Sequence, residues 1–155
     1  MMDKVLTDRK VIVFQLGEEE YAVDVKQVGS IERILPITRV PKTPSYVKGV
    51  INLRGVVTPI IDLRLRFGMG EGEIGEASRI LIVNVDQMDV GLIVDAANDV
   101  IDIPLEKIES AGEVIDSANI DYIEGVAKLG SRLLILLDLH KVLEKDKVQL
   151  QAMEG

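Results

Sequence analysis

Side chains with obvious catalytic potential are scarce in this sequence. His140 is the only histidine, and cysteine is absent. A catalytic histidine needs a serine or cysteine nucleophile nearby, and the G-x-S-x-G pattern that presents such a serine does not occur. One histidine cannot complete a typical zinc site either. We therefore predict that His140 lies on a solvated helix surface and takes part in neither catalysis nor a zinc site.

A glycine-rich segment at 70–75 reads GEGEIG and matches the pattern G-x-G-x-x-G of dinucleotide-binding proteins. That pattern holds a pyrophosphate when a strand precedes it and a helix N-terminus follows it. Here an aliphatic strand follows the glycines, and Glu71 and Glu73 would repel a phosphate. We interpret the stretch of about 68–78 as a linker between two parts of the chain.

A polar turn between two apolar segments contains Asn52, Arg54 and Gly55. The planar guanidinium of arginine pairs well with carboxylates and carbonyls, and loops on rigid scaffolds often carry binding residues. Two interpretations stay open at this point. Arg54 either contacts a partner, or it is a solvated side chain in a turn that Asn52 and Gly55 assist.

The charge balance limits the classes of partner. The 155 residues include 18 basic and 26 acidic side chains, which gives a net charge of −8. Nucleic acids and anionic membranes favour positively charged proteins, so neither is expected as the main partner. The longest aliphatic run, 133–137, is far too short to span a membrane, and the N-terminus lacks an apolar signal segment. We expect a cytoplasmic protein without direct membrane insertion.

Short aliphatic runs separated by turn residues predict a mostly β fold. Hydrophobic residues make up 47% of the chain and aromatic residues only 3%, which favours an aliphatic, strand-rich core. Asp62 and Asp138 are expected to cap a short helix that ends near Gly68 and a C-terminal helix at about 139–153. The expected strands are 10–16, 20–25, 31–35, 37–40, 49–53, 56–61, 79–85, 89–94, 99–103, 122–128 and 132–137.

An internal repeat is the clearest structural signal. Residues 46–67 align without a gap with 122–143, and the matched pairs include Tyr46 with Tyr122, Gly49 with Gly125, and Asp62 with Asp138. A shorter match places the YAVD of 21–24 over the LIVD of 92–95, so Asp24 and Asp95 are expected in equivalent structural turns. We predict two related β-lobes at about 11–67 and 79–138. A matched glycine predicts a positive φ or a close backbone approach.

Three segments carry a resemblance to a known family. TPSYVKGVINLRGVVTPIIDLRLRFG (43–68), VGLIVDAANDVIDIP (90–104) and GSRLLILLDLHKVL (130–143) resemble the CheW-like chemotaxis coupling proteins. The resemblance implies a single CheW-like domain over 1–155, with two small five-stranded SH3-like β-barrels packed together. It also implies an adaptor without catalytic activity, which couples methyl-accepting chemoreceptor tips to the regulatory domain of the chemotaxis histidine kinase.

The resemblance also implies roles for individual residues. The receptor-binding residues would be Arg54, Asn52, Ile12, Val25, Val28 and Ile31. The residues that face the kinase or form a structural turn would be Gly49, Val40 and Ile37. Gly29 and Ser30 depart from the family, which often has an acidic residue there. A different class of function, a barrel that binds a small ligand or catalyses a reaction, would instead show a polar-lined cavity with a perturbed carboxylate.

Overall fold

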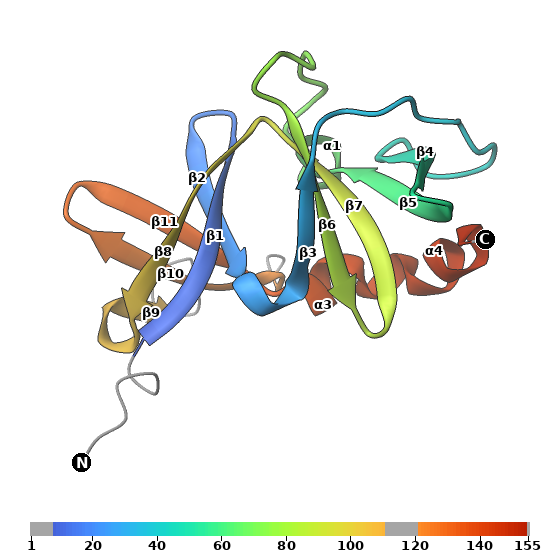
Figure 1. The fold of residues 1–155 in the computed structure, drawn as a ribbon. Coiled ribbons are helices and arrows are strands. Elements are labelled where there is room, and N and C mark those ends of the chain that lie inside the picture. Colours follow the sequence, from blue (N-terminus) through green and yellow to red (C-terminus); the bar gives the residue numbers. More distant parts are fainter. Residues whose placement is uncertain (1–7, 111–120, 155) are drawn as a thin grey trace.

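The computed structural model describes residues 8–110 and 121–154, and it contains two β-sheets side by side with helical segments at one side (Figure 1). The six-stranded sheet, lobe A, has the strand order β8-β1-β2-β11-β10-β9, and the five-stranded sheet, lobe B, has the order β3-β6-β7-β5-β4. Lobe A contains β1 (Asp8–Leu16), β2 (Glu19–Asp24), β8 (Ala96–Pro104), β9 (Ile108–Ser110), β10 (Ile123–Leu129) and β11 (Arg132–Leu137). Lobe B contains β3 (Val28–Glu32), β4 (Val47–Leu53), β5 (Val56–Asp62), β6 (Arg79–Val85) and β7 (Met88–Val94).

The helices are short and lie mainly at the C-terminus. They are η2 (Val25–Gln27), α1 (Leu63–Arg66), η3 (Leu105–Lys107), α3 (Leu139–Leu143), η4 (Glu144–Asp146) and α4 (Lys147–Met153). The predicted fold class, all-β with minor helices and a helical C-terminus, is confirmed. Three details differ. No strand forms at 37–40, where Thr38 alone pairs with Val50, and the strand expected at 31–35 lies at Val28–Glu32. The short strand β9 was not expected.

The expected division into lobes at 11–67 and 79–138 differs from the structure. The hairpin β1–β2 joins the strands that follow residue 95, and β6–β7 joins β3, β4 and β5. The 68–78 segment therefore connects two parts of lobe B. The chain crosses between lobes at η2 and again between β7 and β8. Aliphatic periodicity identifies strands but does not specify which strands pair, because pairing depends on contacts far apart in sequence.

Both lobes nevertheless share one arrangement. In each lobe, an edge strand pairs with the first strand of a hairpin, which is β8 with β1 in lobe A and β3 with β6 in lobe B. The second strand of that hairpin pairs in parallel with one strand of another hairpin, which is β2 with β11 in lobe A and β7 with β5 in lobe B. Thus β3 corresponds to β8, β6–β7 to β1–β2, and β4–β5 to β10–β11. The register shifts at the same place in β4 and β10, between Val47 and Gly49 and between Ile123 and Gly125. The sequence repeat is therefore a structural repeat.

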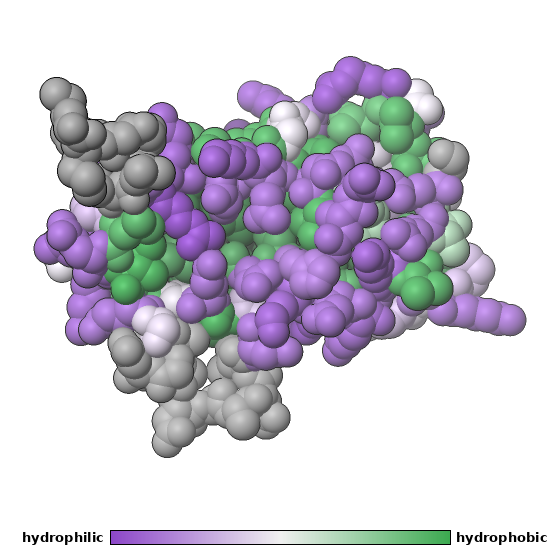
Figure 2. Space-filling view, turned by 90° about the horizontal axis from the view of Figure 1, so that it is seen from below, coloured by the Kyte–Doolittle hydropathy of each residue, from purple (hydrophilic) through white to green (hydrophobic). Residues whose placement is uncertain are grey.

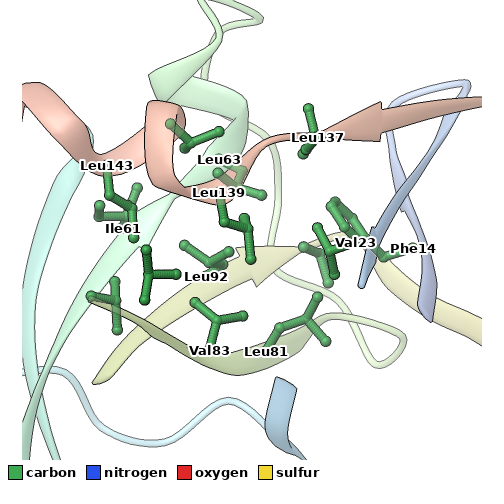
Figure 3. Close-up of a cluster of buried hydrophobic side chains, with 14 of the residues drawn as sticks. Phe14, Val23, Ile61, Leu63, Leu81, Val83, Leu92, Leu137, Leu139 and Leu143 are labelled. Atoms are coloured by element: carbon green, nitrogen blue, oxygen red, sulfur yellow. The ribbon is translucent and has the colours of Figure 1, made fainter. Parts of the chain in front are cut away.

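The core comprises three aliphatic clusters. One fills lobe A, one fills lobe B, and the largest joins the two lobes and the C-terminal helices. Figure 3 shows this joining cluster, in which Phe14 and Val23 come from lobe A, Leu81 and Leu92 from lobe B, and Leu139 from α3. Because one continuous apolar cluster spans the lobes, we expect them to unfold together.

The carboxylates matched by the repeat have structural roles, as predicted. Asp62 accepts a hydrogen bond from the backbone N–H of Leu65 at 3.3 Å, and Asp138 accepts one from Lys141 at 3.2 Å, so both cap helices. Asp95, at the crossover from lobe B to lobe A, accepts hydrogen bonds from the backbone N–H of Gly17 at 2.7 Å and from Arg64 at 2.9 Å. These bonds fix the approach of the two lobes.

The matched tyrosines hold the C-terminal helices in place. The rings of Tyr46 and Tyr122 each lie 5.6 Å from the guanidinium carbon of Arg66. The Tyr46 hydroxyl donates a hydrogen bond of 2.7 Å to Asp146, which lies where η4 meets α4. Burial, reinforced by the hydrogen bond to Asp146, raises the pKa of Tyr46 to about 12. Burial also raises the pKa of Tyr122.

These shifts predict a loss of stability at alkaline pH. A tyrosine whose pKa is raised by folding keeps its proton in the native state while the unfolded chain loses it. Stability should therefore fall as the pH rises from the ordinary tyrosine pKa of 10.0 towards about 12. The change Tyr46→Phe should flatten this slope. The unfolding free energy measured in urea across this pH range tests it, and equal slopes for wild type and variant would contradict it.

Candidate partner-binding surface

A bulge in β3 places two apolar side chains on one face of lobe B. Val28 pairs with Val83 and Ile31 pairs with Leu81, with a register shift between Val28 and Ser30. Residues directly opposite each other in an antiparallel pair point to the same side of the sheet. Since Leu81 and Val83 both belong to the cluster that joins the lobes, Val28 and Ile31 share that side. Without the bulge, a spacing of three would place them on opposite faces.

The corresponding edge of lobe A presents a similar side chain. Val100 on β8 pairs with Ile12 on β1, and Ile12 belongs to the same joining cluster. Val100 is 53% exposed and Ile31 is 44% exposed, whereas Ile12 is 6% exposed. Two edge strands, one from each lobe, therefore expose an aliphatic side chain at the margin of one cluster. We call this surface the seam patch; its members are Val25, Val28, Ile31 and Val100.

The predicted groove residues thus have different positions. Val25 and Val28 are half-buried and pack against the joining cluster, Ile31 is exposed, and Ile12 is buried beneath. Ile12 supports the surface rather than lining it. Seen from below, the surface is mainly hydrophilic, with apolar side chains in small groups (Figure 2). Exposure alone does not single out the seam patch, because exposed aliphatic side chains also occur at Val56, Ile74, Leu105, Leu133 and Val148.

The turn that contains Arg54 has a costly backbone conformation. Arg54 and Gly55 form the two-residue loop between β4 and β5, with φ angles of +52° and +87°. A non-glycine residue in the left-handed region costs about 1–2 kcal/mol. The repeat places Gly130, with a φ of +63°, at the position of Arg54. The Asn52 side chain accepts a hydrogen bond of 2.8 Å from the Gly55 backbone N–H and so supports the turn.

Arg54 reaches the strand that carries Ile31. Its guanidinium lies 3.2 Å from the Glu32 carboxylate, and its side chain is 70% exposed. Although β3 and the β4–β5 hairpin lie at opposite edges of sheet B, the sheet curls so that this pair meets. The hydrogen bond from Ser30, followed by the contact with Arg54, lowers the pKa of Glu32. Because Glu32 pairs with Ile80 of the lobe B cluster, Arg54 contacts β3 on the face opposite to Val28 and Ile31, at the same edge strand.

Lobe A also has an arginine at the corresponding hairpin turn, and it forms an ion pair. Arg132, just after the β10–β11 turn, donates two hydrogen bonds to Glu20, at 2.9 and 3.1 Å, and lies 3.5 Å from Asp99 on β8. Hydrogen bonding to Glu20 raises the pKa of Arg132. This arginine makes a bidentate pair within its own lobe, whereas Arg54 makes a single contact and stays exposed. Of these two turn arginines, Arg54 is the more exposed, at 70% against 38% for Arg132.

The three residues expected at the kinase-facing edge lie apart from the seam patch. Gly49 is inside β4 with a φ of +140°, and a Cβ there would lie 2.0 Å from the Thr38 carbonyl oxygen. Both parts of the glycine prediction are thus confirmed. Ile37 packs against the cluster of lobe B, and Val40 is half-buried in the segment that follows. This segment runs along the outer side of β4.

Among the described residues, we looked for a histidine with a partner, a metal-binding group and a membrane-spanning helix. His140 is half-exposed and its Nδ1 lies 2.7 Å from Asp86. Within 8–110 and 121–154, no group of three histidine or acidic side chains could hold a metal ion. No helix in the same ranges is long and apolar enough to cross a membrane.

A hollow of about 510 Å³ lies at the start of β1, lined by Asp8, Arg9, Lys10, Asp24, Val25, Lys26 and Asp102.

Sequence reasoning missed two residues at or beside this surface. Val100 lies in a segment that reads as an ordinary strand, and no sequence signal marks its exposure, because that depends on β8 being an edge strand. Glu32 supplies an acidic side chain two residues after Ser30, on the opposite face of β3 from Ile31. The resemblance implied an acidic residue earlier, directly after Val28.

Comparison with known proteins finds one family over most of the chain. Residues 10–147 match the CheW-like domain family. The chain is 46% identical over 149 residues to the chemotaxis protein CheW of Bacillus subtilis strain 168, covering 96% of each sequence. It is 37% identical to the chemotaxis protein CheW of Klebsiella aerogenes, covering 92% of this chain and 86% of that protein.

A solved structure agrees with the fold. The crystal structure of the scaffolding protein TtCheW from Thermoanaerobacter tengcongensis matches with a TM-score of 0.81 and 39% sequence identity. The match covers 88% of this chain and 92% of that structure. The sequence and structure comparisons therefore point to the same family.

Proposed function

The chain belongs to the CheW-like domain family, and we propose that it is a cytoplasmic adaptor without catalytic activity, which couples chemoreceptor tips to the regulatory domain of the chemotaxis histidine kinase. By joining the two partners, it would regulate the kinase in signal transduction and be recruited to receptor arrays at the inner membrane. No nucleic acid, metal or cofactor takes part in this proposal.

One observation carries the receptor part of the proposal. The β3 bulge directs Val28 and Ile31 to the face that overlies the joining cluster, and Val100 occupies the matching edge of lobe A. An amphipathic helix binds by burying a few aliphatic anchors in such a surface. We assign the receptor tip to the seam patch, with Ile12 beneath it. Arg54, held by the Asn52-supported turn, would pair with a carboxylate or carbonyl of the tip.

The kinase is assigned to the opposite side of lobe B. Ile37 and Val40 lie in the segment beside β4, away from the seam patch, so two partners could bind at once. Gly49 would act there indirectly, because it permits the close approach of this segment to β4. A binding experiment with a receptor-tip fragment and the isolated kinase regulatory domain tests the proposal. We expect a ternary complex; mutually exclusive binding would contradict two separate surfaces.

The change Arg54→Ala should weaken receptor binding without weakening the fold. Losing a hydrogen bond to a charged group costs about 1–3 kcal/mol, or roughly fivefold to 150-fold in affinity. Arg54→Gly is the companion variant, since glycine accepts the φ of +52° and should unfold no more easily than wild type. Calorimetric titration with the receptor fragment measures the effect.

The matched control is Arg132→Ala in lobe A. It removes a bidentate ion pair with Glu20 within one lobe, so stability should fall while receptor affinity stays near that of wild type. Unchanged receptor affinity in both Arg54 variants would remove Arg54 from the proposed site.

A further inference from the structure

The charges of this protein are unevenly distributed along the chain. Residues 33–70 contain seven basic side chains and one acidic side chain, Asp62, a net of +6. Since the whole chain carries −8, the remaining residues carry −14. The basic residues of 33–70 therefore give this region of lobe B a positive electrostatic potential, while the rest of the protein is negative.

Part of this basic region surrounds a concave surface beside β4. Two adjoining hollows of about 370 and 300 Å³ share Arg39 and Ser45 in their walls. Lys42 lines the first and Lys48 the second. We call this surface the basic hollow, defined by Arg39, Lys42, Ser45 and Lys48. Arg39 and Lys42 are exposed, and neither takes part in any ion pair among the described residues.

The backbone that presents these cations is held in place. The Thr43 hydroxyl lies 3.2 Å from the carbonyl oxygen of Val40 and 3.3 Å from that of Val47, so its one proton is shared between the two acceptors. Gln149 on α4 donates a bond of 3.3 Å to the carbonyl of Lys42, a residue with a φ of +62°. A surface ordered before binding loses less conformational entropy when a partner arrives.

A carboxylate of the chain already lies against this surface. Glu71, from the segment between α1 and β6, lines the second hollow with its Oε1 atom 3.2 Å from Lys48 Nζ. Its side chain is 70% exposed, so the pair contributes little to stability and can be exchanged. The hollow therefore accepts a carboxylate, and Glu71 competes with any carboxylate supplied from outside.

We propose that the basic hollow binds an acidic face of the kinase regulatory domain, with Glu71 as an intramolecular competitor that the partner's carboxylates displace. This inference rests on the proposed function and adds the chemistry of the kinase contact. The choice of an acidic partner rests on charge complementarity, because Arg39 and Lys42 form no ion pair with a carboxylate within 8–110 and 121–154. Rim charges mainly govern the association rate and its dependence on salt.

Binding of the isolated kinase regulatory domain tests the proposal. We expect Arg39→Glu combined with Lys42→Glu to weaken binding about tenfold or more at low salt, because like charges would then face each other. The matched control, Lys107→Glu with Lys128→Glu, makes the same change in net charge at exposed positions of lobe A. The control should keep near-wild-type affinity, and both variants should bind the receptor fragment normally.

The competitor is tested by the opposite change. Glu71→Gln should tighten kinase binding roughly two- to fivefold, the size of an exposed ion pair.

The affinity of wild type for the kinase domain should weaken as salt concentration rises, and the Arg39 and Lys42 charge-reversal variant should show a smaller salt dependence. Arg39→Gln with Lys42→Gln provides a milder pair of changes in case charge reversal disturbs folding, and it should also weaken binding.

The outcomes separate the two proposals. If wild type does not bind the kinase domain, the proposed function and the inference both fail. If wild type binds but neither variant pair nor salt alters its affinity, the inference is overturned and the proposed function stands. Equal weakening by the lobe A control would show a general charge effect and would overturn the basic hollow. Binding of wild type to phosphatidylserine vesicles, lost in the Arg39 and Lys42 variant, would assign the hollow to a membrane instead.

Discussion

Replacing Gly49 with aspartate should cost more stability than any other single change described above. A Cβ at this position would lie 2.0 Å from the Thr38 carbonyl oxygen and 2.7 Å from its carbonyl carbon. Both atoms belong to backbone, so a rotamer change cannot relieve the clash. The φ of +140° adds strain for any side chain. The two hydrogen bonds between Thr38 and Val50, each 2.8 Å, would have to break.

We expect Gly49→Asp to lower the free energy of unfolding by more than about 4 kcal/mol, since a backbone clash and an unpaired buried carboxylate act together. Gly49→Ala should lose less, because it introduces the clash without the charge. Urea denaturation at equilibrium measures both. Kinase binding per folded molecule should also fall, because the segment that carries Ile37 and Val40 would move away from β4.

Two other glycines supply the controls. Gly125, matched to Gly49 by the repeat, would place a Cβ 2.6 Å from the Glu109 carbonyl oxygen, so Gly125→Ala should destabilise lobe A. Gly55 has no atom within 4 Å of a Cβ, and Gly55→Ala should lose only about 1 kcal/mol through its positive φ. If Gly49→Ala and Gly55→Ala have equal effects, close approach is not what Gly49 provides.

The sequence was most informative where a local feature was sufficient. Asp62 and Asp138 capped helices because an N-cap depends on the next three residues. The matched glycines at 49 and 125 identified the two close approaches because only glycine fits there. The C-terminal helix was placed correctly, although Asp146 interrupts it to reach Tyr46. These predictions needed no knowledge of which strands pair.

Non-local pairing explains what the sequence did not show. The expected lobes followed the chain, whereas the structure exchanges β1–β2 and β6–β7 between them. The bulge that brings Val28 and Ile31 to one face leaves no local signature beyond Gly29. Val100 reads as a core strand residue until β8 is known to be an edge. The family resemblance supplied Val28 and Ile31, and the pairing register supplied the reason for their orientation.

The strain at Arg54 gives the two interpretations of its turn different consequences. If the arginine served only to form the turn, glycine would be preferable, as Gly130 shows in the second copy. Lys42, Asp86 and Gln87 also have positive φ angles, so the conformation alone does not mark a binding residue. The exposed contact with Glu32 stabilises the fold only slightly. Under the proposed function, the contact with the receptor tip would be the reason for an arginine at this position.

The change Ile31→Asp should nearly abolish binding of the receptor tip while the protein stays folded. Ile31 is 44% exposed, so the new carboxylate remains in water in the free protein and stability should change by less than about 1 kcal/mol. In the complex the same carboxylate would be buried against an apolar helix without a partner, which costs several kcal/mol. We therefore expect affinity to fall by more than about a hundredfold.

Alanine variants separate anchoring from packing. Ile31→Ala should lower receptor affinity by about 1–2 kcal/mol with a smaller loss of stability, since its side chain is buried mainly in the complex. Val83→Ala, a fully buried position opposite Val28, should instead lose about 2–4 kcal/mol of stability. Val148→Ala, at a side chain 82% exposed on α4, should change neither quantity.

Val28 discriminates most sharply between a closed core and a binding surface, because it is half-buried against the joining cluster. As a purely structural residue it would lose stability on truncation and keep full affinity per folded molecule. As part of the seam patch it should lose both, with Val28→Ala lying between Ile31→Ala and Val83→Ala in stability. Unfolding and titration measured on the same samples decide this. Full receptor affinity in both Val28→Ala and Ile31→Asp would place the receptor elsewhere on the protein, since an apolar helix cannot bury an unpaired carboxylate without loss of binding.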